Sequence, residues 1–301
     1  MKSDNEIYNY KLLVHQLIEE GNYIKAASIY NRLYSKEKTN VDLLYDIAMF
    51  HHEYINPKEA LRYYDEIIEL EESEAGAYYG KAIIHEELDE TDAAIFHYKK
   101  AIEWDPGYYL AHLYLADIYD KRKEDILAED HLRKAIHYAP DEVLCYNHYS
   151  AYLESRGRDV EALEYTKKAL GIDSEHYMSL FNMGVLLKKA SQVQKAIFYY
   201  EKSIVSNPNY PYAYLNLAVI HKASKAYKKA YEVLSSAILH NPSVSVLYYN
   251  RAIMLVQLGD CEKATEDVLQ SIRLSPSLKK YALIDVELKG IDLEKIRTEN
   301  V

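Results

Sequence analysis

The 301-residue sequence is poor in residues that interrupt helices, since it has only nine glycines and seven prolines. Its two cysteines, Cys145 and Cys261, lie far apart and outside any Cys-x-x-Cys or Cys/His cluster, so neither a disulfide framework nor a cysteine zinc site is expected. No stretch approaches the length of an uncharged apolar membrane span, and charges are scattered through residues 1–21. These absences predict a soluble, cytoplasmic protein with no membrane association.

The sequence also lacks an excess of basic residues, because its formal net charge is −11. Residues 1–150 carry a net charge of −14 and residues 151–301 a net charge of +3. Sequence-independent binding to nucleic acid depends on Lys and Arg displacing counterions from phosphates, so no nucleic-acid partner is expected. The asymmetry between the halves indicates a polarised ligand or two different contacts.

A period of 34 residues runs through the chain. Five of the seven prolines are spaced by 34 residues or twice that number, namely Pro106, Pro140, Pro208, Pro242 and Pro276. Stepping by 34 defines eight units without insertion or deletion, which is the mark of an internal repeat. The units are residues 7–40, 41–74, 75–108, 109–142, 143–176, 177–210, 211–244 and 245–278.

Alanine recurs at the twentieth position of every unit, which supports this register independently. These residues are Ala26, Ala60, Ala94, Ala128, Ala162, Ala196, Ala230 and Ala264. A small side chain allows two helices to approach closely, so each alanine marks a helix contact. Apolar residues follow helical spacing in both halves of a unit, and a proline cannot continue the second helix. Each unit is therefore predicted to be a helical hairpin.

The repeat resembles the tetratricopeptide repeat, which has small residues at positions 8 and 20 and proline at position 32. Lys38 and Glu72 depart from the pattern at position 32. The resemblance implies an all-α, right-handed solenoid of antiparallel helix pairs. Residues 1–6 would be a lead-in, and residues 279–301 a capping helix and tail. The capping helix is expected over residues 278–289, where Leu278, Tyr281, Ala282 and Leu288 share one face, with Gly290 ending it.

Few residues remain for catalysis, because only 29 lie outside the predicted units. The segment His85–Asp89 resembles a metalloprotease helix but lacks its second histidine. No glycine-rich phosphate loop, nucleophile elbow or calcium loop occurs in the sequence. We therefore expect no enzymatic activity, no metal and no cofactor.

The family resemblance further implies that the first helices line a concave groove. Asparagine occupies position 6 of three consecutive units, and its amide can pair with both C=O and N–H of a peptide backbone. The alternative is that these side chains only cap helices or face water. The residues predicted to line the peptide-binding groove are Asn182, Asn216, Asn250, Lys188, Lys189, Lys222, Tyr45, Tyr79, Asn147, Phe181, Tyr212 and Tyr249. An acidic groove half is predicted at Asp42, Asp46, Glu53, Glu86, Glu87, Asp117 and Asp120.

The leading hypothesis is a non-enzymatic scaffold that holds an extended segment of an unidentified protein or peptide partner in the groove. Acidic residues of that partner would lie near Lys188, Lys189 and Lys222. One alternative is a structural subunit that assembles with itself or within a larger complex. Another is a helical-repeat reader of nucleic acid, against which the acidic net charge argues.

Overall fold

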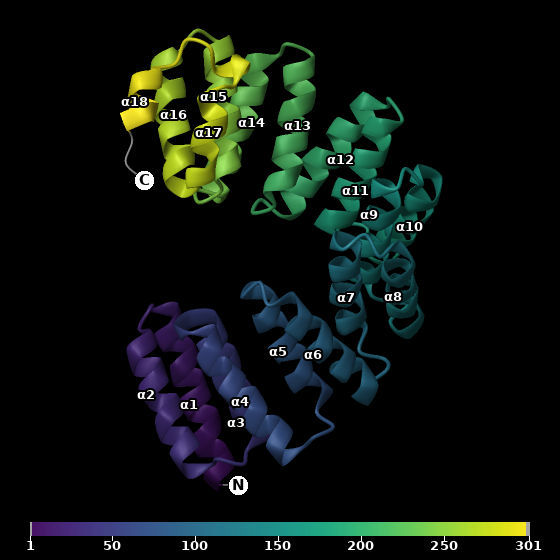
Figure 1. Cartoon of the computed structure of the whole chain (residues 1–301), viewed down its shortest axis with the longest axis vertical. Helices are drawn as coiled ribbons and strands as arrows, with labels where there is room; N and C mark the ends of the chain where they lie inside the picture. The colour runs from purple at the N-terminus through teal and green to yellow at the C-terminus, as the bar shows by residue number, and fades with distance from the viewer. Residues whose placement is uncertain (1, 299–301) are drawn as a thin grey trace. The chain divides into compact units, whose positions relative to one another are not determined.

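The computed structural model describes residues 2–298, and no strand occurs within that range. The chain divides into two compact units, unit 1 up to Pro140 and unit 2 from Asp141. In both units, consecutive helices pack in pairs that short turns connect (Figure 1). This is the all-α solenoid that the repeat predicts, whereas the right-handed superhelix stays a prediction.

The helices of unit 1 follow the 34-residue period. They are α1 (Lys2–Glu19) with α2 (Tyr23–Lys36), α3 (Val41–Phe50) with α4 (Pro57–Leu70), α5 (Ala75–Glu87) with α6 (Thr91–Trp104), and α7 (Tyr109–Lys121) with α8 (Asp125–Tyr138). Because α1 already begins at Lys2, residues 2–6 belong to the first helix and do not form the separate lead-in that was predicted.

Unit 2 continues the same pattern. Its pairs are α9 (Val143–Ser155) with α10 (Asp159–Ile172), α11 (Tyr177–Lys189) with α12 (Val193–Ser206), α13 (Pro211–Ala223) with α14 (Tyr227–His240), and α15 (Ser245–Gln257) with α16 (Cys261–Leu274). We call the surface formed by the first helix of each pair the first-helix face.

The repeated alanines lie where the helices of each hairpin approach. All eight, from Ala26 to Ala264, have an exposed fraction of 0%. The expected close contact is thereby confirmed in every predicted unit, since any larger side chain would force the paired helices apart. One hairpin cannot bury its apolar stripe alone, so its stability depends on the neighbouring hairpins.

The turn between the two helices of a pair uses a left-handed residue at position 15. Glycine occupies it at Gly21, Gly157 and Gly259, with φ between +70° and +86°. The second 34-residue repeat, residues 41–74, differs, because its position 15 is Ile55, a β-branched residue for which that conformation is costly. Here α3 instead continues as a π-helical turn, η1 (His51–Ile55), and Asn56 caps α4. The Asn56 N–H donates to the His51 carbonyl, which closes the turn without a left-handed residue.

The expected continuous capping helix over residues 278–289 is wrong. The segment breaks into a 3₁₀ turn η2 (Pro276–Leu278), the short helix α17 (Lys279–Ala282), and a second 3₁₀ turn η3 (Val286–Leu288), after which α18 (Leu293–Thr298) follows. Ala282 and Leu288 are buried against the last pair as expected, whereas Tyr281 is 52% exposed. Residues 299–301 of the predicted tail lie outside the described range.

Candidate functional site

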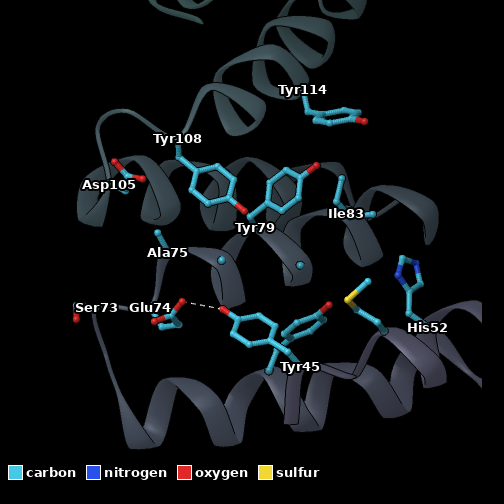
Figure 2. A pocket seen from close by; sticks show the side chains of 14 residues that line it. Tyr45, His52, Ser73, Glu74, Ala75, Tyr79, Ile83, Asp105, Tyr108 and Tyr114 are labelled. Atoms are coloured by element: carbon cyan, nitrogen blue, oxygen red, sulfur yellow. Dashed lines mark hydrogen bonds between the residues drawn. The ribbon is translucent and has the colours of Figure 1, made fainter. Parts of the chain in front are cut away.

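A hollow on the first-helix face of unit 1 has a volume of about 780 Å³. We call it the tyrosine pocket. Helices α3, α5 and α7 contribute to it, with Tyr64 from α4, His52 from η1 and the ends of the turns that precede α5 and α7 (Figure 2). It is lined by Tyr45, Met49, His52, Tyr64, Ser73, Glu74, Ala75, Gly76, Tyr79, Gly80, Ile83, Asp105, Tyr108 and Tyr114.

Two glycines on α5 create the floor of this pocket. A Cβ at Gly76 would lie 2.6 Å from the Tyr45 hydroxyl, and a Cβ at Gly80 would clash with the Tyr64 ring. Both glycines are therefore required for the close approach of the α3–α4 pair to α5. Because they lie four residues apart, they form one stripe of α5, on which the Tyr45 hydroxyl and the Tyr64 ring lie.

The tyrosine rings stand on two sides of that stripe. Tyr45 and Tyr64 meet edge to face, with ring centroids 6.0 Å apart. On the other side, the Tyr79 ring lies 5.0 Å from that of Tyr108 and 6.1 Å from that of Tyr114. Figure 2 shows Tyr79 and Tyr108 facing Tyr45 across the pocket. A side chain entering here would meet aromatic surface from both directions.

Two carboxylates, Glu74 and Asp105, lie at one end of the pocket (Figure 2). The Tyr45 hydroxyl donates to Glu74 Oε1 at 3.1 Å, and Asp105 Oδ1 accepts from the Gly107 N–H at 2.9 Å. Burial, reinforced by the Glu74 carboxylate, raises the pKa of Tyr45. Burial, together with Asp105 and Glu74, also raises the pKa of Tyr108. The pocket therefore disfavours negative charge.

The acidic residues that were predicted for the groove do not line this pocket. Asp46 pairs with Lys11 at 2.5 Å, and Glu87 accepts from His52 Nε2 at 2.7 Å if that nitrogen is protonated. Glu86 accepts from the Tyr98 hydroxyl at 3.1 Å and lies 3.3 Å from Lys121 Nζ. The remaining members are exposed or half-buried, namely Asp42, Glu53, Asp117 and Asp120.

In unit 2, the predicted asparagine ladder forms bonds within the protein. Asn182 Nδ2 donates to Asn147 O and Oδ1 at 3.4 Å. Asn216 and Asn250 instead donate to carbonyls of their own helices, Tyr212 O at 3.1 Å and Val246 O at 2.9 Å. The prediction that Asn147 lines an accessible groove is wrong, because it is 3% exposed and bonds to His176.

The predicted lysines of unit 2 have partners that the repeat pattern does not indicate. Lys189 Nζ lies 2.5 Å from Glu154 and 3.0 Å from Asp159. Lys222 Nζ lies 2.6 Å from Glu287, which follows the repeats. Lys188 Nζ reaches Asn216 Oδ1 at 3.5 Å.

The predicted aromatic anchors of unit 2 also differ in exposure and partners. The Tyr249 hydroxyl donates to Asp285 Oδ2 at 2.7 Å, so the segment at η3 covers this residue as well as Lys222. Tyr212 is 57% exposed, and its ring lies 5.3 Å from that of Tyr210. Phe181 is half-buried and packs edge to face on the same Tyr210 ring.

The sequence identified Tyr45 and Tyr79 of the pocket but missed the two carboxylates and the other three tyrosines, Tyr64, Tyr108 and Tyr114. One usable signal was the segment 76–80, which places two of only nine glycines four residues apart around a pair of tyrosines. The carboxylates gave no signal, because Glu74 and Asp105 are ordinary loop acids until the fold brings them to one opening.

Neither a metal site nor a membrane span emerges from the described residues. No group of three or more His, Cys, Asp or Glu side chains in this range could hold a metal ion. Across residues 2–298, none of the helices has both the length and the apolar character needed to cross a bilayer.

Comparison with known proteins identifies the repeat. A family model described as tetratricopeptide repeat matches residues 75–108 and 179–210. No curated protein matches the sequence. The predicted count of eight repeats stays a prediction.

Solved structures share the fold at low sequence identity. The APC/C hetero-tetramer Cut9–Hcn1 superposes with a TM-score of 0.65 at 16% identity, over 95% of this chain and 55% of that chain. This chain thus spans about half the length of the matched one. The pilF structure of Pseudomonas aeruginosa superposes with a TM-score of 0.56 at 22% identity, over 76% of this chain and 98% of that chain. The human IFIT1 dimer with PPP-AAAA superposes with a TM-score of 0.64 at 16% identity, over 95% of this chain and 76% of that chain. Residues 75–108 and 179–210 therefore match the tetratricopeptide repeat, and the chain shares the fold of these solved structures.

Proposed function

We propose that this protein is a non-enzymatic interaction scaffold that binds a segment of a partner protein on its first-helix face. In unit 1, one partner side chain would anchor in the tyrosine pocket. The observation that carries the proposal is this hollow of about 780 Å³ lined by five tyrosines. Tyrosine provides a large contact area and a polar tip at a small entropic cost, and pockets of this size commonly hold ligands.

The arrangement of the polar groups favours binding over catalysis. Ser73 and His52 lie at opposite ends of the pocket (Figure 2), so they do not form a pair of nucleophile and base. The His52 ring is instead directed to Glu87. What remains around the opening is aromatic surface and carboxylate, which can hold a ligand in place.

The asparagine ladder of unit 2 belongs to the same proposal as a second contact. Asn216 and Asn250 now donate to their own helices, and these bonds would exchange for bonds to a partner backbone. Such an exchange conserves the number of hydrogen bonds, so it would add orientation and little affinity.

A selection of binders from a random peptide library displayed on phage, with the full chain as bait, tests the proposal. Met49 lines the pocket and is 59% exposed, so Met49→Trp should fill the pocket without disturbing the core. The matched control is Val219→Trp, at position 9 of its own unit as Met49 is, and 44% exposed.

We expect the selected peptides to bind Met49→Trp at least about tenfold more weakly than the unchanged protein. Val219→Trp should retain their affinity. The proposal fails if no peptide is enriched, or if the enriched peptides bind Met49→Trp as well as they bind the unchanged protein.

The carboxylates at the pocket argue for a protein partner over nucleic acid, because a phosphate placed there would be repelled by Glu74 and Asp105. A gel-shift experiment at low salt should show no retardation of single-stranded RNA. Retardation that Met49→Trp abolishes would replace the peptide proposal with an RNA one.

A further inference from the structure

We infer that the side chain held by the tyrosine pocket is cationic, an arginine or lysine of the partner segment. The inference rests on the proposed function and adds the chemistry of the anchor. Its basis is that aromatic faces and two carboxylates converge on one hollow.

The aromatic part of the argument is geometric. Tyr45 and Tyr64 stand on one side, and Tyr79, Tyr108 and Tyr114 on the other, with neighbouring ring centroids 5.0–6.1 Å apart within each group. A cation is attracted to the face of an aromatic ring within about 6 Å of its centroid. A side chain entering between the two groups comes within reach of several rings at once.

The two carboxylates determine which charge the pocket attracts. Glu74 and Asp105 both line the hollow, and across the described part of the chain neither forms an ion pair. Two other acids of this face form ion pairs within the protein, Asp46 with Lys11 and Glu86 with Lys121. The charge that Glu74 and Asp105 can attract must therefore come from outside.

The rest of the lining does not oppose a cation. None of the described lining residues is Lys or Arg, and the His52 ring is directed to Glu87. The raised pKa values of Tyr45 and Tyr108 have Glu74 among their causes and agree with a field that favours positive charge.

Shape favours a long side chain with a charged end. The hollow of about 780 Å³ has room for such a side chain, and Met49 and Ile83 add apolar lining against which a hydrocarbon stem can lie. The carboxylates at one end then meet the charged head group. An acidic side chain would bring its charge to the same carboxylates, and a neutral apolar one would leave them without a partner.

The experiment uses the phage-selected peptides that depend on Met49. Each is scanned with alanine, and the residue whose loss weakens binding most is taken as the anchor. We expect this anchor to be arginine or lysine. Replacing an arginine anchor by citrulline, which has the same shape without the charge, should weaken binding about tenfold. A lysine anchor should respond in the same way to norleucine.

The matching change in the protein is the double variant Glu74→Gln/Asp105→Asn. In it, the ratio of arginine to citrulline affinity should fall towards one. The control is Glu72→Gln/Glu103→Gln, which removes the same charge at exposed positions outside the lining and should preserve the ratio.

The inference is overturned if the anchor is neutral or acidic, or if citrulline binds as well as arginine. In either case the Met49-dependent peptides would still support the proposed function. The absence of any Met49-dependent peptide would overturn both proposals, so the two failures are distinguishable.

Discussion

The Lys222 ammonium lies 2.6 Å from the Glu287 carboxylate, although the two residues are 65 positions apart. Lys222 belongs to α13, and Glu287 to the 3₁₀ turn that follows the repeats. The same turn is preceded by Asp285, which accepts from the Tyr249 hydroxyl at 2.7 Å. An acidic segment of this chain therefore already occupies two of the groove positions that the sequence assigns to a partner.

Removing that segment's charges should loosen the end of unit 2. We expect Asp285→Asn/Glu287→Gln to lower the free energy of unfolding by about 1 kcal/mol or less, because the Lys222–Glu287 pair is partly exposed and screened. Urea unfolding measures the loss, and limited trypsin digestion should cut more rapidly at Lys289. The control is Glu294→Gln, whose partner Arg297 lies on its own helix. Unchanged digestion of the double variant would contradict the prediction.

Gly80 should tolerate no side chain without rearrangement. A methyl group there would clash with the buried Tyr64 ring, so Gly80→Ala is expected to lower the free energy of unfolding by about 1–3 kcal/mol. The matched control is Gly171→Ala on α10, where a Cβ meets nothing within 4 Å. That variant should be neutral or more stable by up to about 1 kcal/mol. Thermal unfolding of the two proteins decides the point, and equal melting temperatures would be the opposing result.

Acid should weaken unit 1 through its packed histidines. Burial lowers the pKa of His97 and of His131 to about 4, with Lys81 also acting on His97 and His112 on His131. The unfolded chain has the higher histidine pKa of about 6.5, so it binds more protons between the two values. Stability is thus fully present above about pH 6.5 and falls as the pH is lowered towards 4.

Urea midpoints measured across this range test the acid effect. The change with pH should become smaller in His131→Gln, since His131 Nδ1 lies 2.8 Å from His112 Nδ1 in a shared hydrogen bond. His137→Gln, at an exposed position of the same helix, is the control that leaves this pair intact. A constant midpoint from pH 7 to 4 in the unchanged protein would rule out the titration.

The asparagines of unit 2 should separate into structural and binding residues. Asn147→Ala is expected to cost about 1–3 kcal/mol, because it removes a buried amide that bonds to the half-buried His176 and Asn182. Asn250→Ala should lower the free energy of unfolding by less than about 1 kcal/mol, because the hydrogen bond from Asn250 to the Val246 carbonyl of its own helix is exposed to solvent.

The ladder itself is tested by the triple variant Asn182→Ala/Asn216→Ala/Asn250→Ala. If the amides hold a partner backbone, calorimetric titration of the selected peptides should show weaker binding to this variant. Identical affinity would show that the three asparagines do not bind the partner, and it would not affect the proposal for the tyrosine pocket.

Local features were readable from sequence wherever the repeat imposed them. Ala94 and Ala196 predicted helix contacts that are fully buried, and Gly157 predicted a turn that has a positive φ. Tyr45 and Tyr79 were found because they occupy the same position of consecutive units. Periodicity reports such positions because every hairpin must meet the same neighbour in the same way.

The site could be only partly predicted, because the contacts that form it join residues of different hairpins or residues that do not follow the 34-residue repeat. Ile55 replaced the usual turn by a π-helical one, since a β-branched residue resists the left-handed conformation. Asn147 is buried because His176, at the end of its unit, turns back onto it.

The sequence by itself determined that this chain forms helical hairpins with a 34-residue period, because one small residue and one helix stop recur at fixed distances along the backbone. Only the tertiary structure decided which polar groups remain open to a partner. Glu287 neutralises Lys222, whereas none of the described residues that line the hollow beside Glu74 and Asp105 is Lys or Arg. Electrostatic pairing depends on the distance between two charges in space. For residues that do not follow the 34-residue repeat, their separation along the sequence does not indicate that distance.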